Sequence, residues 1–310
     1  MMTDTLDQVK NDRNKTVGLA LIVLIGLAIT FSLSRWIDAR RPPPDPNVVD
    51  ENLYLNGKTA RRISLGFNGL AADWYWMRSL QYVGGKIIKL PDNVALDSLS
   101  QLNLKLLPSL LDTATTLDPQ FLDPYEYAAV VLPAVNVDEA IRITKKGIDA
   151  NPSAWRLYQH LGYIYWQQHD YQAASEIYGK GAQIPGAPSW MEAMKARMAA
   201  EGGSRSTARE IYTRMYEQSS DDKVKDMAQK RLLQLDAMDQ MDVIRKLLAA
   251  YSDKTKHCPA NWKEFEPILR AARLPTDPTG APLDPSGVPY VFGKTNCEVE
   301  VNPQSTIPGR

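Results

Sequence analysis

The first apolar pattern along the chain is a run without any charged position. Residues 17–34 read VGLALIVLIGLAITFSLS. As a helix rising about 1.5 Å per residue, this run reaches about 27 Å, which is close to the thickness of a bilayer's hydrocarbon core. Trp36 follows at the position expected for an interfacial aromatic side chain. The pattern predicts a transmembrane anchor over residues 17–35, preceded by a short cytoplasmic tail over residues 1–16.

Two other interpretations of this run stay open. A cleaved signal peptide has a shorter apolar core and a small-residue cleavage site, which Ser32-Leu33-Ser34 matches weakly. A buried helix of a soluble domain normally has a polar face, and this run has none. Basic residues flank the run equally, so their distribution does not orient it. A short tail before a long C-terminal region is typical of an uncleaved signal anchor, and it favours a single-pass protein of the bacterial inner membrane with a periplasmic bulk.

A proline-rich linker over residues 36–60 comes next, because consecutive prolines favour an extended, stiff chain. Helical periodicity then returns over residues 61–120, which we expect to form leading helices. In this region one apolar stripe predicts a helix from Gly69 to Val83 that ends at Gly84-Gly85. The stripe recurs every three or four residues and consists of Leu70, Trp74, Met77 and Leu80.

This predicted helix is also the most aromatic stretch of the chain, and it allows two interpretations. In the first, the helix packs on the repeats that follow it. In the second, it is an interfacial or docking helix, with Trp74, Trp76 and Arg78 meeting lipid headgroups or the acidic groups of a membrane partner.

From residue 121 to residue 222 the pattern repeats every 34 positions. Small residues recur at this step in two series, Ala128, Gly162 and Ala196, and Ala140, Ala174 and Ala208. Small residues let two helices approach closely, and large neighbours fill the space around them. The middle copy has the clearest large residues, at Leu161, Tyr165, Tyr171 and Tyr178. This pattern resembles the tetratricopeptide repeat, a helix–turn–helix unit. The resemblance implies three stacked helical hairpins that bind proteins, and it implies no reaction.

The resemblance also implies which residues line the concave groove, namely the second, fifth, ninth and twelfth positions of each first helix. In the three copies these positions hold Leu122, Tyr125, Ala129 and Leu132; Arg156, Gln159, Tyr163 and Trp166; and Trp190, Ala193, Arg197 and Ala200. Large aromatic and arginine side chains are common interface anchors. The predicted partner-binding set is therefore Tyr125, Arg156, Gln159, Tyr163, Trp166, Trp190 and Arg197. We do not expect binding of a C-terminal carboxylate, because the subclass that grips one has Lys and Asn where this chain has Tyr125 and Ala129.

Two further regions follow the repeats. Residues 223–255 continue the helical pattern and predict capping helices for the open end of the stack. Residues 256–310 are rich in Pro and Gly, with turn signals in DPTGAP and DPSGVPY and a short hairpin predicted from YVF and CEVEV. This segment resembles the C-terminal DPxGxPY segment of pseudopilin-type proteins, although no pilin leader precedes it. Cys258 and Cys297 both lie here, and outside the cytoplasm we expect them to form a disulfide.

The composition and the motifs of the chain argue against several classes of function. The 36 basic and 36 acidic side chains give no net charge, which argues against nucleic-acid binding. No P-loop, nucleophile elbow, zinc-protease or dinucleotide motif is present. Three histidines and two cysteines leave little material for a metal site, so we expect no metal, cofactor or enzyme activity.

The sequence thus predicts an all-α fold: a tetratricopeptide-like solenoid with one N-terminal transmembrane helix and a small irregular or β C-terminal module. The predicted function is a membrane-anchored scaffold or assembly factor of the bacterial cell envelope, with membrane-embedded or envelope proteins as partners and the bilayer bound through residues 17–35. The alternatives are an accessory subunit built permanently into a respiratory, photosynthetic or secretion complex, and an enzyme with an unrecognised site.

Overall fold

The computed structural model describes residues 21, 23–37, 40, 55–88, 99–293 and 297–308. The chain divides into two compact units, residues 1–54 and Leu55–Arg310. The predicted tail and part of the predicted anchor, residues 17–20 and Ile22, lie outside the described residues, as does most of the predicted linker.

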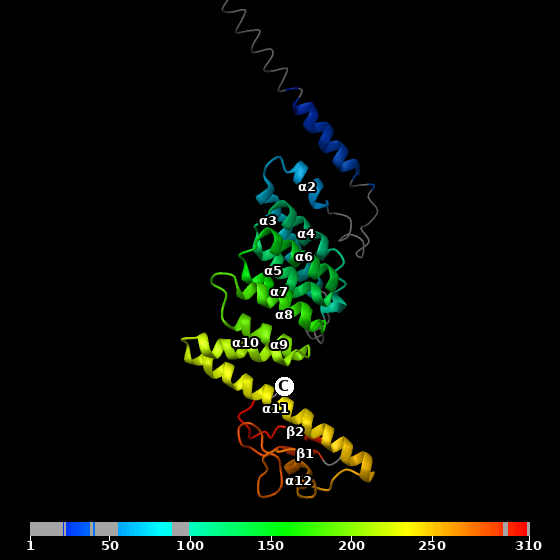
Figure 1. The fold of residues 1–310 in the computed structure, drawn as a ribbon. Helices are drawn as coiled ribbons and strands as arrows, with labels where there is room; N and C mark the ends of the chain where they lie inside the picture. Colours follow the sequence, from blue (N-terminus) through cyan, green and yellow to red (C-terminus); the bar gives the residue numbers. More distant parts are fainter. Residues whose placement is uncertain are drawn as a thin grey trace, which may run out of the picture. The chain divides into compact units, whose positions relative to one another are not determined.

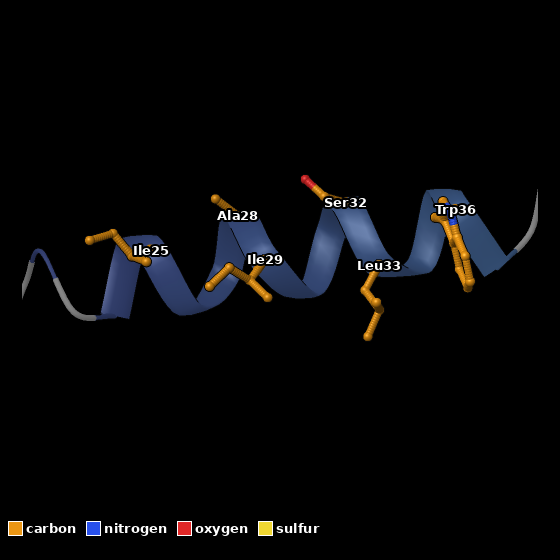
Figure 2. Close-up of a pocket in the computed structure, with 6 residues that line it drawn as sticks. All are labelled: Ile25, Ala28, Ile29, Ser32, Leu33 and Trp36. Atoms are coloured by element: carbon orange, nitrogen blue, oxygen red, sulfur yellow. The ribbon is translucent and has the colours of Figure 1, made fainter.

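In the first unit, residues 23–37 form a helix whose large apolar side chains are all 41–65% exposed. Figure 2 shows six side chains along this helix, five of them apolar, with the Ser32 hydroxyl as the polar exception. One helix supplies all six, so the hollow they outline is an open helix surface and not an enclosed site. Among the described residues, no helix is both long enough and apolar enough to cross a membrane.

The second unit is mostly helical, and its helices pack on their neighbours in sequence (Figure 1). The leading helices are α2 (Gly57–Ile63), α3 (Asn68–Ile88), the 3₁₀ turn η1 (Leu99–Leu102) and α4 (Leu107–Leu117). The three repeats follow as α5 (Leu122–Val131) with η2 (Leu132–Ala134) and α6 (Val137–Ala150), α7 (Trp155–Gln167) with α8 (Tyr171–Ala182), and α9 (Trp190–Glu201) with α10 (Arg205–Gln218). The chain continues through α11 (Asp222–Thr255), α12 (Trp262–Ala271), β1 (Val291–Gly293) and β2 (Glu298–Glu300).

The 34-residue period of the sequence appears directly in the helices. The second helices of the three hairpins begin at Val137, Tyr171 and Arg205, which are 34 residues apart. The small residues of both series are buried at the contacts between helices, with Ala140, Ala174 and Ala208 fully buried. At Gly162, an added Cβ would lie 2.8 Å from the ring of Tyr178, so only glycine permits this approach of α7 to α8.

The core of this unit is a series of apolar clusters and not one central mass. One cluster joins the leading helices to the first repeat, two more lie along α7 to α11, and the last joins α11 to the C-terminal module. Each cluster is built from elements that are neighbours in sequence. This organisation is typical of repeat proteins, in which each unit is stabilised mainly by the next.

Helix α3 corrects two details of the prediction. It continues through Gly84-Gly85 to Ile88, because both glycines stay helical at a cost of about 1 kcal/mol each. The predicted stripe is also not the packed face: Leu70, Trp74, Met77 and Leu80 are all exposed. The buried face lies on the opposite side, where α3 packs against α4, and consists of Ala72, Tyr75, Ser79, Tyr82 and Val83.

The C-terminal module packs on the long helix α11. Strands β1 and β2 form the predicted antiparallel hairpin, with Phe292 opposite Val299. Two turns precede the hairpin and share one design: the carboxylates of Asp277 and Asp284 each accept hydrogen bonds from the backbone two and four residues later. Gly280 and Gly287 close these turns at φ values of +86° and +84°, which only glycine adopts without strain.

Candidate functional site

The structure separates the predicted groove residues into a buried group and an accessible group. In the first repeat, Tyr125, Ala129 and Leu132 are buried, so they do not line an open surface. In the second and third repeats, Tyr163 is 50% exposed and Trp190 is 40% exposed. Their neighbours in the predicted set are partly or fully exposed: Arg156, Gln159, Trp166 and Arg197. The candidate surface is therefore confined to these two repeats.

Tyr125 is a core residue because the leading helices cover it. Its hydroxyl donates to the backbone carbonyl of Thr115 on α4 over 3.3 Å. Its ring lies against Gly147, where an added Cβ would come within 2.8 Å of the ring. Burial is the main cause that raises the pKa of Tyr125 to about 12. The predicted groove position in the first repeat is thus occupied by packing between α4, α5 and α6.

Trp166 is the centre of the accessible group. Its ring meets Tyr163 edge-on at 5.6 Å between centroids, and the Arg197 guanidinium lies 4.9 Å from its centroid. Its indole Nε1 donates to Glu201 Oε2 over 3.0 Å, and Arg197 Nε donates to Glu201 Oε1 over 2.7 Å. Helix α7 therefore holds two aromatic rings against an ion pair on α9, and the cation–π contact and the two hydrogen bonds fix the ring orientation.

A second aromatic pair lies at the N-terminal ends of the same helices. Trp155 meets Trp190 at 6.2 Å between centroids, and the Arg156 guanidinium lies 5.0 Å from the Trp155 ring. Gln159 is partly exposed between the two pairs along α7. The predicted residues of the second and third repeats thus form two aromatic and arginine clusters on neighbouring helices.

A polar cavity of about 1050 Å³ adjoins the Trp166 cluster. Its lining includes the Arg197–Glu201 pair and charged residues that the sequence prediction did not include. Arg205 Nη1 donates to Asp239 over 2.8 Å and to Asp242 over 2.6 Å. The lining consists of Tyr171, Arg197, Ala200, Glu201, Gly203, Arg205, Ser206, Tyr212, Arg231, Gln234, Leu235, Met238, Asp239 and Asp242.

The charges in this cavity stabilise one another. The hydrogen bond to Asp239 is the largest cause that raises the pKa of Arg205 above its ordinary value, and Asp242 adds to it. Burial acts to raise the pKa of Asp242, but the hydrogen bonds and charges of Arg205 and Arg245 outweigh burial and lower it. The cavity therefore presents fixed charges of both signs beside aromatic faces.

The predicted aromatic docking helix is divided between the interior and the surface. Trp76 packs edge-on against Phe121 and Tyr127, at 6.2 Å and 5.2 Å between ring centroids. Trp74 is exposed, and Arg78 is partly exposed. One side of this helix therefore packs on the first repeat, as the first interpretation expects, and the other side faces outward.

Away from these clusters, Cys258 and Cys297 form a disulfide with a Cα–Cα distance of 5.8 Å, and it links the end of α11 to the hairpin. Among the described residues, no group of three or more His, Cys, Asp or Glu side chains is placed to hold a metal ion. No protein-family model and no curated protein matches the chain.

Proposed function

We propose that this chain is a membrane-anchored scaffold of the bacterial cell envelope that holds a protein partner in the groove of its second and third repeats. The tetratricopeptide resemblance supports this proposal through the 34-residue period of α6, α8 and α10. The observation that carries it is the Trp166 cluster, in which Tyr163, Arg197 and Glu201 meet beside a polar cavity of about 1050 Å³.

Preorganisation is the physical reason for choosing this surface. Aromatic rings bury a large area with few rotatable bonds, and arginine adds directional hydrogen bonds to carboxylates or carbonyls. The ring of Trp166 is already held by its hydrogen bond to Glu201, so a partner would not have to order it.

The proposed anchor covers residues 17–35, with the N-terminus in the cytoplasm and the second unit in the periplasm. Its support is the uncharged sequence of residues 17–34 and the exposed apolar side chains of residues 23–37. Arg40 lies 4.1 Å from the Trp36 ring centroid, a pairing that suits the boundary between hydrocarbon and headgroups. Carbonate washing of membranes tests the anchor, because it releases proteins that are bound only peripherally.

The groove is tested by Trp166→Ala in the full-length chain, with Tyr216→Ala as the matched control. Tyr216 is 43% exposed on α10 and belongs neither to the predicted groove set nor to the cavity lining. We expect Trp166→Ala to weaken retention of a stoichiometric partner from detergent-solubilised membranes by about 2 kcal/mol, or about 30-fold, while Tyr216→Ala leaves it unchanged. Equal retention by both variants, with both folded by thermal melting, would exclude the groove.

A further inference from the structure

A second surface, on α2 and α3, carries an unusual number of exposed apolar side chains. Six large apolar residues within residues 63–77 are 53–85% exposed, and we call them the α2–α3 face: Ile63, Leu65, Phe67, Leu70, Trp74 and Met77. Single exposed apolar residues are common on soluble proteins, but six of them within residues 63–77 are a candidate interaction surface.

The local fold directs these side chains outward. Leu65 has a φ of +50° and Gly66 a φ of +94°, so the chain turns sharply between α2 and α3. A bulky residue with a positive φ is uncommon and costs conformational energy. The turn leaves Leu65 85% exposed and Phe67 70% exposed. The strained turn thus places two large apolar side chains in contact with solvent.

Helix α3 contributes the other three residues of the α2–α3 face. Leu70, Trp74 and Met77 are four and three residues apart, so they project from one side of the helix. The buried residues, such as Tyr75 and Ser79, project from the other side and pack towards α4. This helix therefore has two apolar faces, and the described part of the chain covers only one of them.

The charges around the α2–α3 face indicate which kind of partner it binds. The chain as a whole has no net charge, but residues 55–88 hold five basic side chains against Asp73 alone. Lys58, Arg61 and Arg62 are exposed on α2, and none of them forms an ion pair with a carboxylate of the described residues. Like charges would meet if a second copy docked on this face, which disfavours self-association.

We propose that the α2–α3 face binds the surface of an anionic bilayer. Leucine, phenylalanine and tryptophan side chains enter the boundary between headgroups and acyl chains, and the basic residues of α2 pair with lipid phosphates. The inference deepens the proposed function, because residues 55–88 follow the proposed anchor closely in the sequence.

A fluorescent probe at Leu70 tests the proposal in full-length protein reconstituted into vesicles. Leu70→Cys is labelled with an environment-sensitive fluorophore, since the native cysteines are joined in a disulfide and do not react. The vesicles contain phosphatidylcholine with or without phosphatidylglycerol. A lipid with a spin label close to its headgroup quenches a probe in the interface, and a second lipid with a spin label deep in its acyl chain quenches a probe in the hydrocarbon core, where position 27 would lie. Tyr216→Cys serves as the solvent-exposed control, and Leu27→Cys reports on the proposed anchor.

We expect lipid quenching at position 70 but not at position 216, with stronger quenching in vesicles that contain phosphatidylglycerol. Arg61→Glu with Arg62→Glu should lower the ratio of protein with a membrane-bound α2–α3 face to protein with an unbound face by at least about fivefold. One basic residue near an anionic surface contributes about that factor. This double variant changes only exposed residues, so folding should be retained.

The remaining outcomes separate the two proposals. Quenching at position 27 without quenching at position 70 overturns the α2–α3 proposal and leaves the anchor intact. The absence of quenching at position 27 excludes the anchor. Quenching at position 70 then tests membrane binding by the α2–α3 face independently of the anchor. A probe at position 70 that is shielded from aqueous iodide but is not quenched by lipid indicates a protein occupant, and it also overturns the proposal.

Discussion

The ring of Tyr178 on α8 lies against Gly162 on α7, so closely that a Cβ added at Gly162 would come within 2.8 Å of the ring atom Cε2. Both residues are buried, and they belong to the middle copy of the repeat. The same relationship recurs in the first copy between Gly147 and Tyr125, with the glycine on the second helix. A glycine paired with a tyrosine ring is thus the contact that sets how closely these helices pack.

The first prediction concerns this contact. Gly162→Ala should lower the free energy of unfolding by about 1–3 kcal/mol, because the added methyl forces the Tyr178 ring or the helix to move. Gly84→Ala is the matched control: Gly84 is helical and a Cβ there meets nothing within 4 Å. The control should stabilise the protein by about 0.5–1 kcal/mol. Urea unfolding checks both, and equal effects of the two variants would contradict the role assigned to Gly162.

The second prediction separates the buried tyrosine from the accessible one. Tyr125→Ala should lower the free energy of unfolding by about 3–5 kcal/mol, because it removes a fully buried ring and its hydrogen bond to Thr115. Tyr163→Ala should lower it by less than about 1 kcal/mol, since half of that side chain is in water. Thermal melting of both variants measures the difference. Similar losses would place Tyr163 in the core and remove it from the groove.

These two tyrosines also show which features of the structure the sequence pattern predicts and which it does not. The tetratricopeptide resemblance assigns both of them to the lining of the groove, so it gives them the same role. The period itself is predictable, because small residues at helix contacts are a local property of each copy. The burial of Tyr125 is not predictable from the repeat pattern, because it depends on α4, a leading helix that the pattern does not contain. The same reason explains α3, where the packing of α4 decided which of two apolar faces became buried.

The cavity beside Trp166 is a second feature that the sequence pattern does not predict. Glu201 holds the Trp166 indole from a position 35 residues later, and Arg205 meets Asp239 across 34 residues. Charged residues are frequent on helix surfaces, so nothing in the sequence marks these pairs in advance. Only the spacing of Arg197 and Glu201, four residues apart on one helix, is a signal that could have indicated an ion pair.

The third prediction concerns the ionic contact between α4 and α6. Asp112 accepts from Lys146 Nζ over 3.0 Å and from Arg142 Nη1 over 2.9 Å. Burial acts to raise the pKa of Asp112, but Arg142 and Lys146 outweigh burial and hold it below its ordinary value of 3.8. A carboxyl group with a lowered pKa stabilises the fold above its unfolded pKa, and the contribution is lost as the pH falls through the folded pKa.

Asp112→Asn should therefore destabilise the protein by about 1–3 kcal/mol at neutral pH and by progressively less below pH 3.8. Asp226→Asn is the control, because its pair with Lys230 is exposed and such pairs contribute less than about 1 kcal/mol. Urea unfolding between pH 2.5 and pH 7 compares the three proteins. A difference between wild type and Asp112→Asn that does not change with pH would contradict the assignment.

The last prediction concerns the disulfide of the C-terminal module. Cys258 and Cys297 are 39 residues apart, so the bond closes a long loop that contains α12, both aspartate turns and β1. Closing a loop of this size restricts the unfolded chain and stabilises the folded module by about 3–4 kcal/mol in the chain-entropy treatment. Cys258→Ser with Cys297→Ser should therefore lower stability by that amount, chiefly within residues 256–308, because the repeats lie in separate apolar clusters.

Hydrogen exchange followed by mass spectrometry locates the loss of stability along the chain. The effect of a reductant on wild-type protein should match the double variant, and the same reductant should leave the double variant unchanged. Faster exchange spread equally over α5 to α10 would show that the module and the repeats unfold as one cooperative unit, contrary to the separation of their cores.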